Sequence, residues 1–346
     1  MTTCEVTVIN TGEQFSVGQA EIILDGALAQ GIRIPHQCRG ASCGTCKVRV
    51  LSGAVDHGWS LGLAITDEEK GQGYCLLCQA RAITPELRIE IPSGVGAGNE
   101  QATEMCAEVL SVVSLTPRVK RVVLATPADR TFVYPAGSYL EVQIPGVDPN
   151  RMYSFASACR NDGLLELFVS RHTFGKASGF IHDTLRVGDL IRVRGPFGAC
   201  RLPDGPGPVI GLAGGTGLAP VLAILEDALE RGADEPMLLL HSVSQTREVF
   251  ALDRLVGLSR RHGNFKYQIL VTDEQSPYTS HPMLAPAWIR QTFSSLATHR
   301  AVIGGSPGFV EACAQTCISL GLDAARISTD SFVPSERRAI DENAHP

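Results

Sequence analysis

The chemistry of this chain is indicated first by its cysteines. Eleven cysteines occur among 346 residues, and five of them fall in two segments, CRGASCGTC over residues 38–46 and YCLLCQ over residues 74–79. The chain does not open with a basic stretch followed by an apolar one, so we expect no secretory signal and a reducing, cytoplasmic compartment with few disulfides. Clustered cysteines in that setting indicate metal or redox chemistry.

Two metal sites fit these cysteines. One is a four-thiolate zinc site, in which the pair Cys43 and Cys46 faces the pair Cys75 and Cys78. The other is a [2Fe–2S] cluster, because Cys38-x4-Cys43-x2-Cys46 followed by a later cysteine is the plant-type spacing. The cluster also accounts for Cys38, and the small residues of the loop would let backbone N–H groups approach its sulfurs. We therefore predict an iron–sulfur cluster, with Cys75 or Cys78 as the fourth ligand.

A second chemical signal is a glycine-rich turn. The sequence VIGLAGGTGLAP over residues 209–220 predicts a buried strand, a glycine turn and a helix. Backbone N–H groups at a helix N-terminus favour an anionic pyrophosphate, although a tight turn without a ligand is the alternative for this pattern alone. No Gly-Lys-Ser or Gly-Lys-Thr follows, so we do not expect ATP binding. Residues 205–225 are uncharged and long enough to cross a bilayer, but their glycines and prolines favour the strand–turn–helix.

The elements that must position these residues fall into three regions. In the first, apolar alternation predicts a strand hairpin around Thr11-Gly12 and strands over 47–51 and 87–91. Apolar residues at helical spacing predict a helix over 21–30. A glycine-rich segment after Ile91 is typical of a linker.

The second and third regions have different patterns. From about 104 to 203 the chain is rich in strands and poor in helices, which is typical of an antiparallel barrel. Its predicted strands are 109–113, 119–124, 139–144, 164–169 and 190–194. From about 207 strands and helices alternate, which is typical of a doubly wound parallel sheet. Its predicted strands are 209–213, 237–242, 267–271 and 301–303, and its predicted helices are 218–231, 248–261 and 307–320. The expected fold is therefore a multidomain protein of α+β and α/β class.

Composition and charge exclude several classes of protein. The chain is 44% hydrophobic and 19% charged, which is far too apolar for a disordered protein, and its length suits two or three domains. Its formal net charge of −6 argues against a nucleic-acid binder. The balance suits a soluble protein that docks on a positive surface.

Residues 1–93 resemble a plant-type ferredoxin, which implies a β-grasp domain around the cluster. In that family the last ligand lies in a Leu-x-Cys-Gln segment at the start of a strand, and Leu76-Leu77-Cys78-Gln79 matches this segment. The ligand set that the resemblance implies is Cys38, Cys43, Cys46 and Cys78. The remaining cysteines are expected to be structural, with Cys313 and Cys317 on one face of a helix.

The second region resembles the flavin domain of the ferredoxin–NADP reductase superfamily. One matching motif is Arg151-Met-Tyr153-Ser154, which by itself is also typical of a strand start with a surface arginine. The resemblance implies that Tyr153 packs on the isoalloxazine and that Arg151 pairs with the pyrophosphate. It also implies that Ser154 forms a hydrogen bond near the flavin N5.

Further matches support the same resemblance. Gly175, Lys176 and Ser178 form a turn that would offer phosphate donors at a helix start, and GPFG follows at 195–198. Phe332 resembles the aromatic residue of a final strand that covers the flavin, although an ordinary core position is the alternative. Residue types alone leave FMN open, whereas the resemblance implies FAD.

In the same superfamily the glycine turn binds a nicotinamide dinucleotide, with Thr216 near the nicotinamide. The usual Cys-Gly-Pro-Pro motif is Gly304-Gly305-Ser306-Pro307 here, so Gly304 replaces the cysteine near the ring. The usual arginine position after the second strand is Ser244, and no basic cluster awaits a 2′-phosphate, which favours NADH over NADPH. The implied nucleotide-binding residues are Gly214, Gly215, Thr216, Gly217, Ser242, Arg247 and Gly304.

The three regions in this order resemble the reductase component of bacterial multicomponent oxygenases, of the phenol hydroxylase and methane monooxygenase type. The resemblance implies that electrons pass from NADH to FAD, to the cluster and to an oxygenase or hydroxylase of aromatic or hydrocarbon substrates. No residue is then needed for acid–base catalysis on a substrate bond. The implied domains are 1–93, 104–203 and 207–335, with a linker at 94–103 and a mobile tail at 336–346.

Other functions are compatible with parts of this pattern. The same redox chain could serve a Rieske dioxygenase or a deoxysugar dehydratase. A non-catalytic zinc-binding module is a hypothesis of a different class, which leaves residues 104–335 unexplained. Neither nucleic acid nor a membrane is expected as a partner, and a monomer is expected because the cluster must reach both the flavin and the partner.

Overall fold

The structure, a computed structural model, describes most of the chain. The described residues are 3–32, 34–36, 41, 44–58, 60, 64–92, 102–147, 150–198 and 200–332. The predicted tail, and the predicted linker apart from residues 102 and 103, lie outside them. The chain divides into two compact units, residues 1–100 with 331–346 and residues 101–330.

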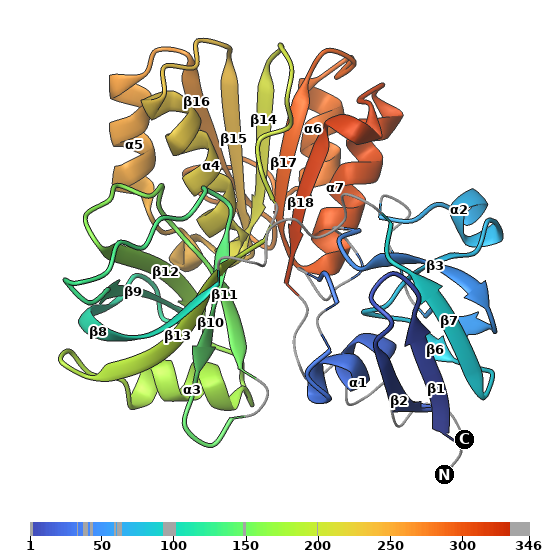
Figure 1. The fold of residues 1–346 in the computed structure, drawn as a ribbon. Helices are drawn as coiled ribbons and strands as arrows, with labels where there is room; N and C mark the ends of the chain where they lie inside the picture. The colour runs from blue at the N-terminus through green and yellow to red at the C-terminus, as the bar shows by residue number, and fades with distance from the viewer. Residues whose placement is uncertain are drawn as a thin grey trace. The chain divides into compact units, whose positions relative to one another are not determined.

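The first unit is built on a five-stranded mixed sheet. Its elements are β1 (Thr3–Val8), β2 (Gln14–Gly18), α1 (Ile23–Ala29), β3 (Lys47–Ser52), β4 (Val55–Asp56), α2 (Asp67–Gly71), β5 (Tyr74–Leu76), β6 (Arg81–Ala82) and β7 (Glu86–Glu90). The strand order is β2-β1-β7-β3-β5, with β1 antiparallel to β2 and parallel to β7 (Figure 1). Alternate residues of β1, such as Val6 and Val8, are buried in one apolar core with Ile23 and Leu24 of α1, because successive strand residues face opposite sides.

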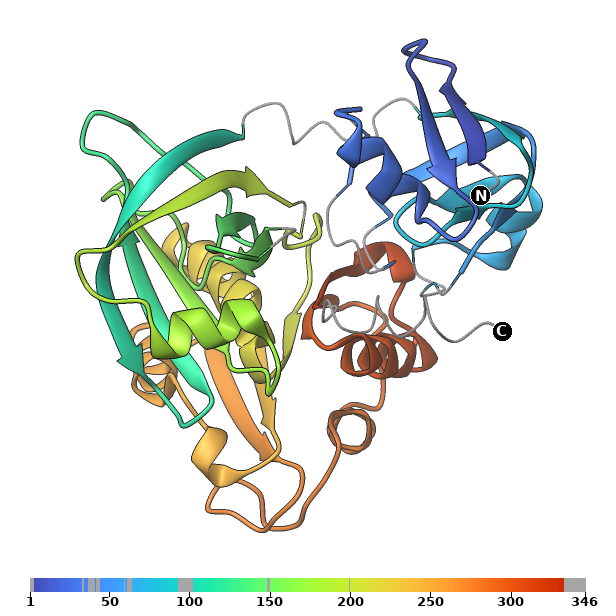
Figure 2. The ribbon, with the colours of Figure 1, turned by 90° about the horizontal axis from the view of Figure 1, so that it is seen from below.

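The second unit begins with an antiparallel sheet. Its elements are β8 (Thr103–Ser114), β9 (Val119–Ala125), β10 (Tyr139–Gln143), β11 (Arg151–Ser154), β12 (Leu164–Ser170), α3 (Lys176–Asp183) and β13 (Leu190–Phe197). The strand order is β11-β10-β13-β8-β9-β12. An antiparallel bridge between Phe155 and Leu167 joins the two edges, which closes the sheet into a barrel. Helix α3 lies against the barrel in both views (Figure 2).

A parallel sheet completes the second unit. Its elements are β14 (Val209–Gly214), α4 (Leu218–Glu230), β15 (Met237–Val243), α5 (Leu252–Arg261), β16 (Phe265–Val271), α6 (Ala285–Thr292), β17 (Arg300–Gly305), α7 (Pro307–Ser319) and β18 (Ile327–Ser331). The strand order is β16-β15-β14-β17-β18, with α4 and α5 on one face and α6 and α7 on the other (Figure 1). The order reverses between β14 and β17, and ligands of doubly wound sheets bind beyond the strand ends at that point.

The predicted fold class is confirmed in all three parts, and the differences are local. The helix predicted over 248–261 begins only at Leu252, because Ala251 has a φ of +57° that a right-handed helix cannot include. Helix α6 was not predicted. Cys313 and Cys317 are fully buried on α7, as expected for core residues.

The uncharged segment over 205–225 forms β14, a short 3-10 turn and α4, as predicted. Within the part of the chain that the structure describes, no helix is both long and apolar enough to cross a membrane.

Candidate functional site

Two of the four predicted cluster ligands lie together at one end of the first sheet. Cys46 directly precedes β3, and Cys78 follows β5, its antiparallel partner. The Leu77 N–H donates to the Cys46 carbonyl at 3.1 Å, so the two cysteines are neighbours across the pair. Both are buried, with exposed fractions of 3% and 2%. Cys78 lies in a turn between β5 and β6, not at the start of a strand as the family segment suggests.

Cys75 has a different setting from Cys78. It lies within β5, opposite Val48, and its side chain is fully buried in the apolar core. Burial, followed by the neighbouring Cys78, raises the pKa of the Cys75 thiol to about 12. Cys78 lies in the turn beside Cys46, whereas Cys75 lies within the strand. The setting supports Cys78 over Cys75 as the fourth ligand, which stays a prediction.

Cys38 and Cys43 lie outside the described residues, so the full ligand set is not tested. The described part of their loop fits a cluster in one respect. Ala41 and Gly44 have φ values of +55° and +70°, a conformation that lets a short loop fold back on itself. Among the residues that the structure describes, no three His, Cys, Asp or Glu side chains come together elsewhere as a metal site.

The predicted flavin motif forms β11 at an edge of the barrel sheet. Arg151 and Tyr153 are two residues apart and so share one face of the strand, and Ser154 is the residue at which the strand ends. Tyr153 packs against the barrel core, and burial raises the pKa of its hydroxyl, so the phenol stays neutral. A neutral aromatic face beside an arginine fits a flavin and its phosphates.

Ser154 joins this motif to the nucleotide sheet. Its Oγ donates a 2.8 Å hydrogen bond to Oδ2 of Asp330 on β18, and both residues are buried. Sequence analysis did not single out Asp330. Its position two residues before Phe332, in a segment already noted for its resemblance, is the signal that could have found it. Phe332 itself is half-buried and directly follows β18, and its role stays a prediction.

The predicted phosphate turn at the start of α3 is held by its own side chains. Ser178 Oγ accepts a hydrogen bond from the His172 N–H and donates one to the Gly175 carbonyl, both at 3.1 Å. A Cβ at Gly175 would lie 2.6 Å from that Oγ, so a larger residue would displace the Ser178 hydroxyl. Ser178 therefore shapes the turn, while the exposed Lys176 and the backbone N–H groups of the helix start are left to face an anion.

The predicted nucleotide residues meet at the carboxyl ends of β14, β15 and β17. Gly214 pairs with Ser242, and the following 3-10 turn contains the half-buried Thr216. A Cβ at Gly217 would lie 2.2 Å from the Gly304 carbonyl oxygen. We call the turn Gly214–Gly217, together with Gly304, the nucleotide cradle.

The cradle gives a physical reason for the glycine that replaces the usual cysteine. A Cβ at Gly304 would lie 2.6 Å from the Gly217 carbonyl oxygen and 3.1 Å from Val221 Cγ2. A cysteine there would therefore push the two turns apart. Phe309 packs its ring against Gly214 from the start of α7, within 3.1 Å of where a Cβ would be.

A histidine that was not predicted from the sequence supports the nucleotide cradle through a contact with its backbone. His241 Nε2 lies 3.2 Å from the Gly215 carbonyl oxygen, and its ring contacts Phe250 edge to face. The side chain is fully buried, and burial lowers its pKa to about 4, so the ring is neutral and Nε2–H donates to Gly215. The signal in the sequence is one imidazole that interrupts the apolar strand Met237–Val243.

The loop after β15 carries the remaining predicted residue. Arg247 is exposed in a short 3-10 turn, away from the cradle glycines in sequence but at the same strand ends. Thr246 N–H donates to Glu274 Oε1 at 2.8 Å. This bond, with a smaller effect of Arg247, lowers the pKa of Glu274.

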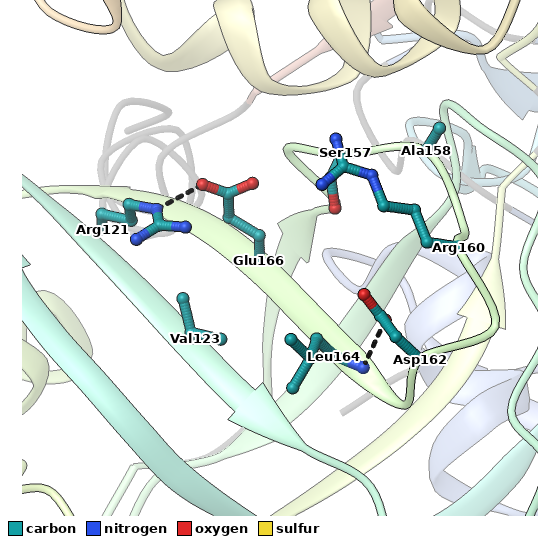
Figure 3. Close-up of a pocket in the computed structure, with 8 residues that line it drawn as sticks. All are labelled: Arg121, Val123, Ser157, Ala158, Arg160, Asp162, Leu164 and Glu166. Carbon is teal, nitrogen blue, oxygen red and sulfur yellow. Dashed lines mark hydrogen bonds and ion pairs between the residues drawn. The ribbon is translucent and has the colours of Figure 1, made fainter. Parts of the chain in front are cut away.

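A separate cavity opens on the barrel. Figure 3 shows the ion pair of Arg121 and Glu166 on one side of it, and Arg160 and Ser157 on the other. Its volume of about 60 Å³ is far below what a flavin or a dinucleotide needs. Neither group is therefore assigned to this cavity.

Three protein-family models match the chain in the order of its structural parts. A 2Fe-2S iron-sulfur cluster binding domain matches residues 6–82. An oxidoreductase FAD-binding domain matches residues 107–202, and an oxidoreductase NAD-binding domain matches residues 212–315. The three groups predicted from the sequence are confirmed as those that these domains bind.

Known proteins resemble the chain over most of its length. The reductase subunit of aromatic O-demethylase from Amycolatopsis sp. is 30% identical over 94% of this chain and 97% of that protein. The reductase component of phenol 2-monooxygenase from Pseudomonas sp. is 32% identical over 76% of this chain and 74% of that protein. The crystal structure of the Amycolatopsis cytochrome P450 reductase GcoB has a TM-score of 0.73 at 30% identity, covering 96% of this chain and 99% of that chain.

Proposed function

We propose that this chain, which belongs to the family of iron–sulfur flavoprotein reductase components of oxygenases, passes electrons from NADH through FAD and a [2Fe–2S] cluster to a partner oxygenase. The observation that carries the proposal is the hydrogen bond from Ser154 to Asp330. It holds the flavin motif of β11 against the sheet that forms the nucleotide cradle. A nicotinamide and a flavin bound at these two places would meet at one junction.

Arg151 and the start of α3 would hold the flavin by its phosphates. The guanidinium forks onto phosphate oxygens, and the N–H groups at a helix start favour negative charge. Tyr153 would cover the ring system from the same strand face. When bound, a flavin accepts a hydride and releases electrons singly, while a [2Fe–2S] cluster carries one electron, so together they match a two-electron donor to one-electron acceptors.

Ser154 would hold a hydrogen bond at the reacting flavin nitrogen. Its hydroxyl hydrogen is already donated to Asp330, so its oxygen is left to accept a hydrogen bond. That arrangement would suit an N–H donor of the flavin ring system. Asp330 would thereby orient Ser154.

We propose NADH as the donor in preference to NADPH. Arg247 is the single basic residue of the loop at 244–248, and the carboxylates of Glu248 and Glu274 accompany it. Carboxylates at this strand end repel a 2′-phosphate, whereas they accept hydrogen bonds from ribose hydroxyls.

The proposed acceptor is an oxygenase that hydroxylates aromatic or hydrocarbon substrates. This proposal is supported by the names of two relatives, which are reductases of a phenol 2-monooxygenase and of an aromatic O-demethylase. The likeness to a cytochrome P450 reductase over nearly the whole of both chains favours a P450-type oxygenase as the second candidate. The formal net charge of −6 suits docking on a positive surface of either partner.

We also propose a cytoplasmic monomer. No disulfide joins the cysteines that the structure describes, which suits a reducing compartment. One chain carries the domains for all three groups, so no second copy is needed to complete the electron path.

The test compares two electron acceptors in the wild type and in Cys78→Ser. Ferricyanide takes electrons from a reduced flavin directly, whereas cytochrome c stands in for an oxygenase that receives them from the cluster. We expect NADH to reduce both acceptors with the wild type, and NADPH to do so more slowly. Cys78→Ser should keep ferricyanide reduction and lose cytochrome c reduction. If Cys78→Ser loses both activities equally, or keeps both, the proposed order of electron transfer is contradicted.

A further inference from the structure

Five charged side chains form a continuous chain across the junction between the barrel and the parallel sheet. Two of them come from barrel strands, one from the loop between β11 and β12, and two from helices of the nucleotide-binding part. In order they are Arg121 on β9, Glu166 on β12, Arg254 on α5, Glu226 on α4 and Arg160 in the loop. We call this set the junction charge chain. None of these residues belongs to the predicted flavin or nucleotide sites.

Arg254 is the centre of the junction charge chain. Its Nη1 lies 3.1 Å from Glu166 Oε2 on the barrel side. Its Nη2 pairs with Glu226 Oε2, and its Nε donates to Glu226 Oε1 at 3.3 Å, so the guanidinium forks onto one carboxylate. Arg121 pairs with the other oxygen of Glu166, as Figure 3 shows, and Arg160 Nη2 lies 3.3 Å from Glu226 Oε1.

The central members are withdrawn from water. The side chains of Glu226, Glu166 and Arg254 are 2%, 14% and 20% exposed. Burial opposes the charge of Arg254, but its bonds to the two carboxylates outweigh this effect and raise the pKa of the guanidinium. Buried charges of this kind tolerate the loss of a partner poorly and are little screened by salt.

The junction charge chain is attached at both ends to the elements that carry the chemistry. On the barrel side, the Glu166 carbonyl accepts a 2.7 Å hydrogen bond from Ala156 N–H, two residues after Ser154. On the other side, Glu226 lies on α4, which begins directly after Gly217. Glu226 is about 12 Å along the helix axis from the first helical residue, Leu218. A shift of Arg254 would therefore move the cradle relative to the flavin strand.

We infer that the junction charge chain sets the distance between the nucleotide cradle and the flavin strand, with Arg254 as a positioning residue for hydride transfer. The inference rests on the proposed function, since it concerns the step from NADH to the flavin. Apolar contacts such as the edge-to-face pair of Phe168 and Phe250, at 5.2 Å between ring centroids, hold the two parts together. They have little directionality, whereas a forked ion pair fixes orientation.

Hydride transfer is sensitive to such positioning. Reacting atoms must approach to about 3–3.5 Å, and a displacement of about 1 Å can cost roughly 100-fold in rate. A residue that only positions the two parts should therefore change the rate of the chemical step. It should leave the affinities for NADH and FAD almost unchanged, because neither binding site includes it.

The test uses Arg254→Met in the full chain with its cofactors bound. Rapid mixing with NADH under anaerobic conditions gives the limiting rate of flavin reduction and the Kd for NADH separately. We expect the limiting rate to fall by about 10- to 100-fold, with the Kd for NADH and the FAD content nearly unchanged. An unchanged limiting rate, or a change confined to the Kd, would overturn the inference.

Arg118→Met is the matched control. Arg118, in the turn before β9, pairs with Glu248 at 3.6 Å across the same two parts, but its side chain is 60% exposed. Exposed pairs contribute little, so this variant should keep the wild-type limiting rate. A fall equal to that of Arg254→Met would mean that any lost charge at this junction has the effect, which contradicts a specific role for Arg254.

Two further measurements keep the inference testable if Arg254→Met does not fold. Arg254→Lys keeps the charge but loses the fork, and we expect a smaller fall in the limiting rate. Calorimetry of the protein with its FAD and cluster bound gives a readout other than activity: the second unit should melt in one transition in the wild type and in two in Arg254→Lys. One shared transition with an unchanged rate would overturn the inference. If the wild type does not oxidise NADH, the proposed function is wrong. The calorimetry then tests separately whether Arg254 couples the barrel to the parallel sheet.

Discussion

The first sheet and the parallel sheet position their functional residues by different means. In the first unit, Cys46 and Cys78 lie at the ends of paired strands, and the proposed binding groups are side chains. In the nucleotide cradle the proposed binding groups are backbone N–H groups, and a Cβ at Gly217 or Gly304 would close the space between the two turns. Substitutions therefore remove a ligand in one case and deform a surface in the other.

The two means also differ in what supports them. The position of Cys78 depends on an apolar core and paired strands, and many different side chains can supply these. The cradle depends on contacts from three separate segments, through His241, Gly304 and Phe309. We therefore expect substitution of a cluster ligand in the first unit to abolish cluster binding, and substitutions around the cradle to weaken nucleotide binding gradually.

The largest expected effect comes from the two neighbouring cysteines of β5 and its turn. Cys78→Ser should lose the cluster, because it removes a thiolate ligand. Cys75→Ser should keep it, because Cys75 lies within β5 and not in the turn beside Cys46. Iron and acid-labile sulfide analysis of both proteins measures the difference, and cluster loss in Cys75→Ser alone would reverse the ligand assignment.

The next effect concerns His241 and the pH dependence of stability. Burial lowers its folded pKa to about 4, below the ordinary value of 6.5, so the unfolded chain binds the extra proton between these values. Stability should therefore be complete above about pH 6.5 and fall as the pH drops towards 4, by ~3 kcal/mol in total.

His241→Gln isolates this contribution, because other groups also titrate in the same range. The difference between the wild-type and variant unfolding free energies, measured by urea titration at several pH values, should carry the dependence. Parallel curves for the two proteins would show that His241 is not the neutral donor to Gly215.

Arg151→Ala should have an intermediate effect. It removes one side-chain contact to the FAD phosphates but leaves the backbone N–H groups at the start of α3 in place. Loss of a charge-assisted bond to phosphate should weaken FAD binding by about 2 kcal/mol, or roughly 30-fold in Kd. Arg192→Ala on β13 is the control, since Arg192 is exposed and paired with Glu104 on the same barrel. Equilibrium FAD binding measures both, and equal affinity of Arg151→Ala and the wild type contradicts the phosphate role.

The smallest expected effect separates two glycines of the cradle. Gly217→Ala should cost about 1–3 kcal/mol through overpacking, because its Cβ would lie 2.2 Å from the Gly304 carbonyl. A Cβ at Gly215 would lie in open space, so Gly215→Ala should cost only the strain of an alanine at a φ of +53°, about 1 kcal/mol. NADH affinity and thermal unfolding of both variants should rank Gly217→Ala as the more damaging, and the reverse order would contradict the close approach of the two turns.

The same contrast explains what the sequence could predict. The spacing of the cysteines and the strand–glycine–helix pattern are local, and both the sheet that carries Cys46 and Cys78 and the cradle over Gly214–Gly217 formed where expected. Alternation along the strands likewise predicted the barrel and the doubly wound sheet. These features depend on neighbouring residues in the chain, so a pattern in the sequence contains them.

Contacts between distant segments were not predictable in this way. Asp330 reaches Ser154 from 176 positions away, and Glu226 meets Arg254 only after two elements fold side by side. Nothing near Gly304 in the sequence shows that a Cβ there would meet Gly217. These residues are found only when the fold brings their partners together.

The central claim, that NADH, FAD and the cluster are linked in one chain, is tested most directly by an anaerobic visible absorption spectrum of the purified protein before and after NADH is added. We predict overlapping flavin and iron–sulfur bands that both bleach on addition of NADH. A flavin band that bleaches while the iron–sulfur bands persist, or a colourless protein that retains zinc, would contradict the account.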